Sequence, residues 1–120
     1  MFLFTIGHTA PAGYDVMSWR ILASQAKPSI RPHRSEARFY YRGCKIESIM
    51  FYLDIDKMEK IAKVNGSITP ALRDILESSQ PVYCFIGKKR YFEAIKRALP
   101  GRFILLAQHG QRYIIANRLR

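Results

Sequence analysis

Two short runs of residues that are apolar on both faces most constrain how this chain can fold. Residues 2–6 read Phe-Leu-Phe-Thr-Ile and end at Gly7, and residues 81–86 read Pro-Val-Tyr-Cys-Phe-Ile and end at Gly87. A strand that is apolar on both faces is typical of the centre of a sheet covered on both sides. A stretch with helical periodicity follows each run, over residues 14–26 and 88–99. The sequence therefore predicts an α/β or α+β domain built on one mixed sheet.

The remaining segments complete the predicted order of elements. Residues 37–42 and 45–53 flank a glycine-containing turn and are expected to form a β-hairpin rich in aromatic residues. Caps at Asp54 or Asp56 and at Thr69 predict a helix that runs to Val64 and a shorter helix over residues 69–79. Residues 102–107 and 112–116 are expected to form two strands around a turn. The predicted order is β-α-β-β-α-α-β-α-β-β, with about six strands flanked by helices in a single domain spanning residues 1–120.

A basic segment that contains prolines joins the first predicted helix to the predicted hairpin. Residues 27–35 hold Pro28, Pro32, His33 and three basic side chains. Because proline lacks a backbone donor and disrupts helices, we expect this segment to be a loop. A loop of this length is long enough to carry a function.

The net charge is the property in which the chain departs most from an average globular protein. It has 20 Lys and Arg against 9 Asp and Glu, a formal net charge of +11 at pH 7. Residues 1–45 carry +5 and residues 88–120 carry +8, whereas residues 46–87 carry −2. Concentrated cations repel one another, so this distribution favours a polyanionic partner. The alternatives are a solvated surface without a partner and an anionic membrane surface, which no basic amphipathic helix supports.

Three consecutive cations, Lys88, Lys89 and Arg90, occupy the start of the helix predicted over residues 88–99. The N-terminus of a helix is already partly positive, so cations are unfavourable there and acidic residues are usual. A bound anion removes this conflict, because free backbone N–H groups and the side chains then bind it together. We therefore expect these residues to bind phosphate. The alternative is that Lys88 and Lys89 lie in a loop and the helix begins at Arg90 or Tyr91.

His8 directly follows the first apolar run, where a parallel strand would end. Ligands of open α/β sheets bind just beyond the carboxyl ends of the strands. If residues 2–6 and 82–86 form neighbouring parallel strands, His8 lies beside Lys88, where it would contact a phosphate or act as a general acid–base. The alternative is a histidine that caps a turn. No metal or cofactor is expected, because zinc-binding and nucleotide-binding motifs are absent from the sequence.

The strand predicted over residues 37–42 has two chemically different faces. Alternation places Phe39 and Tyr41 on one face and Arg38, Tyr40 and Arg42 on the other. If the Phe39 face meets the core, Tyr40 is free to stack a nucleic-acid base while the two arginines hold phosphates. The alternative is an edge strand whose charges prevent aggregation. The basic residues expected to extend this surface are Lys27, Arg31, Arg34 and Lys45.

These observations favour a small, cytoplasmic nucleic-acid-binding protein without enzymatic activity. RNA or single-stranded DNA is the preferred partner, because no recognition helix is apparent. A second hypothesis is a metal-independent phosphodiesterase or nuclease, or a nucleotide-binding enzyme, in which His8 is the acid–base group and Lys88 and Arg90 stabilise phosphate charge. A third is an interaction or inhibitor protein that docks on an acidic protein surface. No apolar run approaches the ~20 residues of a membrane span, so no membrane partner is expected.

Overall fold

The computed structural model describes residues 11–118, with side chains from residue 19, and its centre is a mixed sheet of five strands. β1 runs parallel to β2 and to β3, whereas β5 is antiparallel to β3 and to β4. The described residues form a compact α+β fold, which confirms the predicted class. In their order across the sheet, the strands are β2 (Glu59–Lys60), β1 (Arg38–Arg42), β3 (Val82–Ile86), β5 (Arg112–Asn117) and β4 (Phe103–His109).

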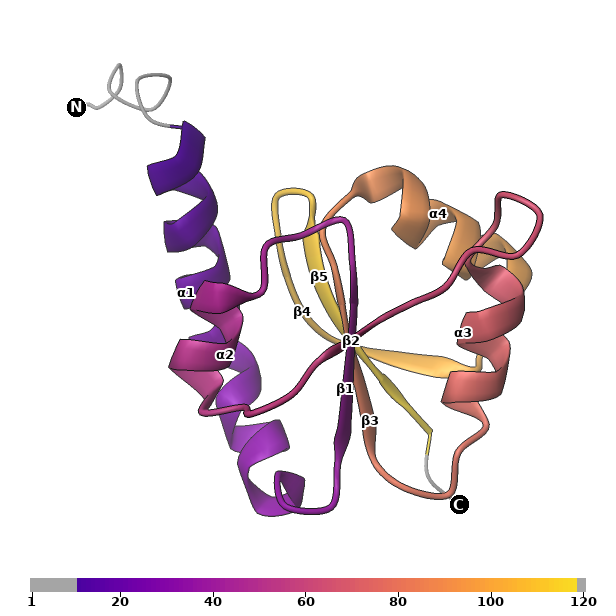
Figure 1. The fold of residues 1–120 in the computed structure, drawn as a ribbon, viewed down its shortest axis with the longest axis horizontal. Helices are drawn as coiled ribbons and strands as arrows, with labels where there is room; N and C mark the ends of the chain where they lie inside the picture. Colours follow the sequence, from indigo (N-terminus) through magenta and orange to yellow (C-terminus); the bar gives the residue numbers. More distant parts are fainter. Residues whose placement is uncertain (1–10, 119–120) are drawn as a thin grey trace.

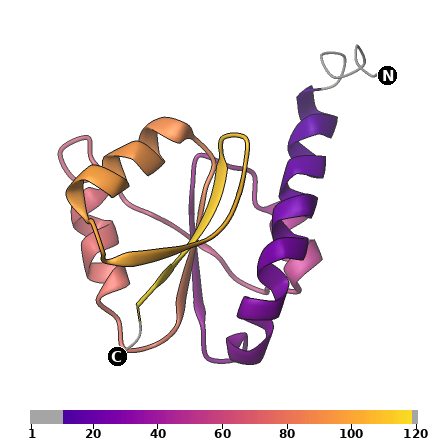
Figure 2. The ribbon, with the colours of Figure 1, turned by 180° about the vertical axis from the view of Figure 1, so that it is seen from behind.

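Helices cover both faces of the sheet (Figures 1 and 2). One face is covered by α1 (Pro11–Ile30), which continues into a 3-10 turn over Arg31–His33, and by α2 (Glu47–Leu53). The other face is covered by α3 (Thr69–Leu76) and α4 (Lys89–Ala98). The sheet is therefore the middle layer of three, with a hydrophobic core on each side.

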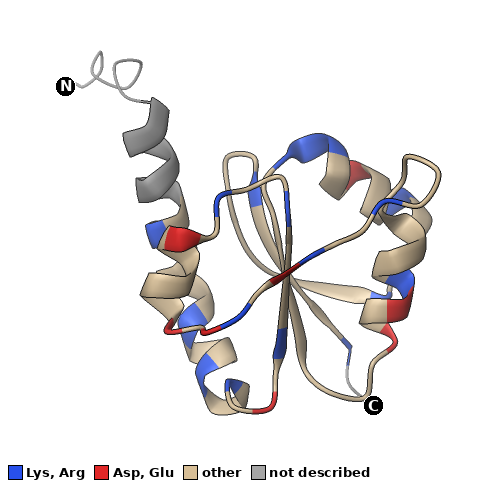
Figure 3. Ribbon diagram, in the orientation of Figure 1, with Lys and Arg blue, Asp and Glu red and all other residues tan. Residues whose placement is uncertain are grey.

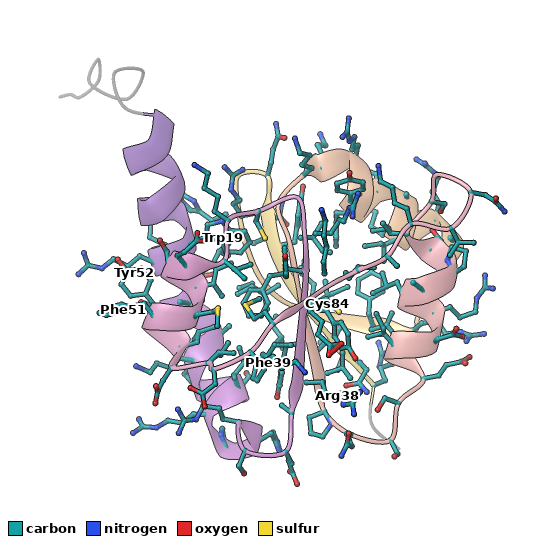
Figure 4. All side chains as sticks on the ribbon, viewed as in Figure 1. Trp19, Arg38, Phe39, Phe51, Tyr52 and Cys84 are labelled. Carbon is teal, nitrogen blue, oxygen red and sulfur yellow. The ribbon has the colours of Figure 1, made fainter. Side chains whose placement is uncertain are left out.

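β3 separates the two cores and is buried along its whole length. Its Phe85 packs against Trp19 of α1, with ring centroids 6.1 Å apart. Figure 4 shows Trp19 and Phe39 directed into this core between the sheet and α1 and α2. Cys84 points to the opposite core, where α4 contributes Phe92 and α3 contributes other apolar side chains. This double burial is what the continuous apolar run predicted.

Most elements in the second half of the chain are confirmed. The strand predicted over residues 81–86 is β3, the helix over 88–99 is α4, and the two strands over 102–107 and 112–116 are β4 and β5. The helix over 69–79 is α3, which ends earlier, at Leu76. The strand predicted over residues 2–6 and the candidate residue His8 lie outside the described residues.

The predicted strand over residues 45–53 is wrong, because these residues form α2. Ile49 and Leu53 are buried, whereas Phe51 between them is 80% exposed and points away from the core (Figure 4). A strand would place all three side chains on one face, whereas a helix separates Phe51 from the other two. The apolar spacing of Ile49 and Leu53 is therefore helical, and the predicted hairpin does not form.

The helix predicted to run from Asp54 or Asp56 to Val64 is also wrong. Asp54 has a left-handed backbone (φ 55°), and it ends α2 by donating its N–H to the carbonyl of Met50. The chain then extends, and its residues 59 and 60 pair with the free edge of β1 as the short strand β2. Asn65 and Gly66 form a tight turn that Val64 and Ser67 close by backbone pairing.

Residues 27–35 are mostly helical rather than a loop. Ala26 and Ile30 are buried and continue the apolar stripe of α1, so tertiary packing extends this helix through Pro28. Pro28 itself is exposed in the last turn of the helix, so the burial of Ala26 and Ile30 outweighs the backbone hydrogen bond that proline cannot donate. The 3-10 turn follows, and only residues 34–37 separate it from β1.

Candidate functional site

The carboxyl ends of three parallel strands meet at one edge of the sheet, and basic residues occupy or follow all three ends. β1 ends at Arg42, β2 leads within three residues to Lys63, and β3 leads through Gly87 into the three cations that begin α4. Figure 3 shows basic positions at the start of α4 and on neighbouring segments at this end of the sheet. We call this set the basic rim, and its members are Arg42, Lys63, Lys88, Lys89 and Arg90.

Two glycines allow the chain segments after β1 and β3 to touch. The N–H of Gly87 donates to the carbonyl of Arg42 at 2.9 Å. A Cβ on Gly87 would lie 2.1 Å from the carbonyl oxygen of Gly43, so no larger residue fits. Gly43 has a left-handed backbone (φ 75°), and a Cβ on it would lie 3.1 Å from Cγ of Lys88 and 3.2 Å from Cε2 of Tyr91. This contact holds Arg42 beside the first turn of α4.

Tyr91 lies at the centre of the basic rim. The Cζ atoms of Arg90 and Arg42 are 5.1 and 5.7 Å from the centroid of its ring, and Nζ of Lys63 is 6.0 Å away. A hydrogen bond of 3.2 Å from Arg42 Nη1 to the carbonyl of Ile61 joins β1 to the segment that carries Lys63. Three separate segments thus bring three cations to one half-buried phenol. We call these four residues the Tyr91 cluster.

The cations change the acidity of the phenol. Hydrogen bonding by Arg90 and then by Arg42 lowers the pKa of Tyr91 to about 8, and the positive charge of Lys63 contributes. A lowered pKa means that the surroundings stabilise negative charge at this point. The Tyr91 cluster is therefore electrostatically suited to an anion.

The Tyr91 phenol is expected to ionise near pH 8, about two pH units below an ordinary tyrosine. The difference in phenolate absorbance between the wild type and Tyr91→Phe, followed across an alkaline titration, measures this ionisation. In Arg42→Ala/Arg90→Ala, the midpoint of this titration should move toward the ordinary pKa of a tyrosine, because the two main causes of the lowered pKa are removed. An unchanged midpoint in that variant would contradict the assignment.

Within the described residues, no carboxylate neutralises the basic rim. The ion pairs between described side chains use other cations: Glu93 pairs with Lys96 at 3.2 Å, and Glu59 pairs with Lys57 at 3.6 Å. Lys63, Lys88, Lys89 and Arg90 are exposed, and Arg42 is half-buried. The rim is thus a patch of positive charge that an external anion can reach.

The structure divides the predicted binding residues into two groups. Arg42, Lys88, Lys89 and Arg90 belong to the basic rim. Lys27, Arg31 and Arg34 lie instead where α1 ends, and they line a groove of about 340 Å³ with Leu53 and Asp54 of the α2 end. Arg34 forms an ion pair with Asp54 there, which neutralises part of this second group. Arg38 lies at the amino end of β1 and Arg42 at its carboxyl end, so only Arg42 of these two arginines belongs to the basic rim.

The face of β1 that carries Tyr40 is less open than predicted. Phe39 is buried in the core beneath α1 and α2, as expected, but Tyr40 is half-buried against the core of α3 and α4. Arg38 is exposed, and a hydrogen bond with Tyr40 raises the pKa of the Arg38 guanidinium. The alternative of an edge strand is wrong, because β2 and β3 pair with β1 on its two sides.

Two residues of the Tyr91 cluster were missed in the sequence. Tyr91 falls on the apolar stripe of its helix, together with Phe92 and Ile95, which is the pattern of a core residue. Lys63 lies within the segment predicted to form a helix up to Val64, and that helix does not form. The available signal was the run of cations directly before Tyr91, which marks the first turn of α4 as exposed.

Among the side chains that the structure describes, those of residues 19–118, no group of three or more His, Cys, Asp or Glu gathers in an arrangement suited to a metal ion. Cys84 is completely buried, and burial raises the pKa of its thiol, so the thiol is protonated at neutral pH. Cys44 donates from Sγ to the carbonyl of Phe85 at 3.5 Å.

Comparison of the chain with known protein families, curated proteins and solved structures finds no match. In the described range, no helix combines the length and the apolar character that crossing a bilayer requires.

Proposed function

We propose that this protein binds nucleic acid, and that the basic rim holds its phosphates. The observation that carries the proposal is the convergence of Arg42, Lys63 and Arg90 on Tyr91 without a neutralising carboxylate among the described residues. Lys88 and Lys89 extend the patch along the first turn of α4. The role predicted for Arg38 and Tyr40 remains a hypothesis, and the rim supports the proposal independently of it.

The physical basis is the cost of holding like charges together. Cations gathered around one ring repel one another, and the positive end of α4 adds to the repulsion. A phosphate reverses the sign of these interactions, since guanidinium and ammonium groups form short, charge-assisted hydrogen bonds with its oxygens. Arginine is especially suited, because its planar group donates two parallel hydrogen bonds. The rim therefore favours a phosphate-containing partner over a neutral one.

The basic rim favours a single strand over a duplex. Its cations surround the aromatic ring of Tyr91, and cations combined with an aromatic side chain are typical of surfaces that bind single strands. Only the first turn of α4 belongs to the rim, and Phe92, Ile95 and Leu99 pack the helix against the sheet. The nuclease alternative requires His8, which lies outside the described residues, and no observation within residues 11–118 favours it.

We expect the protein to bind single-stranded RNA or DNA more tightly than duplex, with a steep salt dependence. Fluorescence anisotropy with labelled oligonucleotides of equal length, in a series of salt concentrations, measures both properties. Log affinity should fall linearly with log salt by about 0.7 for each phosphate held. Absence of binding at low salt, or affinity that does not respond to salt, would contradict the proposal and favour a protein partner.

A further inference from the structure

The Tyr91 cluster gathers its cations around one aromatic ring instead of distributing them along a path. Three cationic groups from β1, the β2–α3 segment and α4 lie within 5.1 to 6.0 Å of the centroid of a single ring. An internal phosphodiester carries one negative charge, and successive phosphates of a strand lie apart. A ligand with a larger charge at one position matches this arrangement better.

We propose that the Tyr91 cluster recognises a phosphate monoester, such as the phosphorylated end of a nucleic-acid strand. This inference rests on the proposed function and adds to it the chemical class of the bound group. A phosphate monoester carries about −1.5 to −2 charges at pH 7 and has three terminal oxygens that accept hydrogen bonds. A diester has one negative charge and two such oxygens.

The donors of the cluster suit this ligand in number and kind. Arg42 and Arg90 supply guanidinium groups, Lys63 supplies an ammonium group, and the Tyr91 hydroxyl supplies a neutral donor below its pKa. One cation is thus available for each terminal oxygen. The contact between Gly43 and Gly87 holds together the segments that carry Arg42 and Arg90 before a ligand binds.

Lys88 and Lys89 supply the part of the site that a strand needs beyond its first phosphate. Both are exposed and directly precede Arg90 in the chain, outside the Tyr91 cluster. A strand bound by its phosphorylated end would place its next phosphates against these lysines, whereas a free nucleotide would leave them unused. The monoester is the shared chemistry of both ligands, and the experiment separates the two sources.

The test compares one short single-stranded oligonucleotide in three forms: with a 5′-phosphate, with a 3′-phosphate, and with hydroxyls at both ends. At least one phosphorylated form should bind about tenfold tighter or more than the hydroxyl form, as expected for an added charge-assisted contact. Competition by a nucleoside monophosphate then identifies the source: strong competition indicates a free nucleotide, and weak competition indicates a strand end. Equal affinity of all three forms would overturn the inference and leave the proposed function intact, whereas no binding of any form would overturn both.

Lys63→Ala and Arg73→Ala provide matched variants for this comparison. Each removes one exposed cation, from the Tyr91 cluster and from α3 respectively. Lys63→Ala should reduce the preference for the phosphorylated form by about fivefold or more, while Arg73→Ala should leave it unchanged. An equal preference in both variants would show that the monoester binds elsewhere. Thermal unfolding of both proteins verifies that they are folded.

Discussion

Gly87→Ala is expected to destabilise the protein by about 3 kcal/mol or more, since the added methyl group overpacks a site formed by backbone. Its Cβ would lie 2.1 Å from the carbonyl oxygen of Gly43 and 2.8 Å from Cβ of Cys44. The nearest atoms belong to the backbone of Gly43 and not to a flexible side chain, so the segments after β1 and β3 would have to separate to make room. The midpoint and slope of urea unfolding measure the change in the free energy of unfolding.

Gly101→Ala is the control for this prediction. Gly101 has a left-handed backbone (φ 74°), but nothing lies within 4 Å of the position that a Cβ would take. Its replacement should cost only about 1 to 2 kcal/mol, the strain of an alanine in that conformation. If Gly87→Ala is as stable as Gly101→Ala, the two segments are not in the contact that positions the basic rim.

Arg42→Ala/Arg90→Ala is expected to weaken binding of a single-stranded oligonucleotide by about a hundredfold or more at low salt. Each arginine should lose a charge-assisted hydrogen bond worth about 1.5 to 3 kcal/mol. The two residues come from different elements of the fold, since β1 carries Arg42 and α4 carries Arg90. A large combined loss would therefore support their convergence as well as their charge.

Arg73→Ala/Arg97→Ala removes the same number of arginines from exposed positions on α3 and α4 outside the rim. This variant has the same net charge, so a general effect of charge on nucleic-acid binding appears equally in both double variants. We expect its affinity to fall by less than about fivefold, because loss of exposed charges away from the ligand is screened by salt. Equal losses in the two variants would contradict a localised site.

The parts of the fold that were predicted correctly are those that local patterns determine. β3 is apolar on both faces, α4 has a strong helical stripe that ends at Pro100, and β4 and β5 surround a short turn. The segments that were predicted wrongly depend on distant partners. Residues 59 and 60 are extended because they complete the edge of β1, and α1 continues past Pro28 because Ile30 is buried under the sheet.

Only part of the candidate site was predicted, because local patterns identify some of its residues and the others depend on distant partners. Lys88, Lys89 and Arg90 were identified from the conflict between a helix N-terminus and consecutive cations, which is a local signal. Arg42 was identified for a different surface, and Lys63 was missed, because only the parallel order of β2, β1 and β3 brings these residues to one edge of the sheet. Strand order depends on contacts between residues far apart in the chain, and the periodicity of the sequence does not reveal these contacts.

The most direct test of the central claim is the slope of log affinity against log salt for the two double-arginine variants and the wild type. If the basic rim holds the phosphates, Arg42→Ala/Arg90→Ala should reduce the slope by about 1.4, the contribution of two phosphates of a single strand. Arg73→Ala/Arg97→Ala should keep the slope of the wild type. The same slope in all three proteins would show that the phosphates are bound elsewhere and would contradict the account.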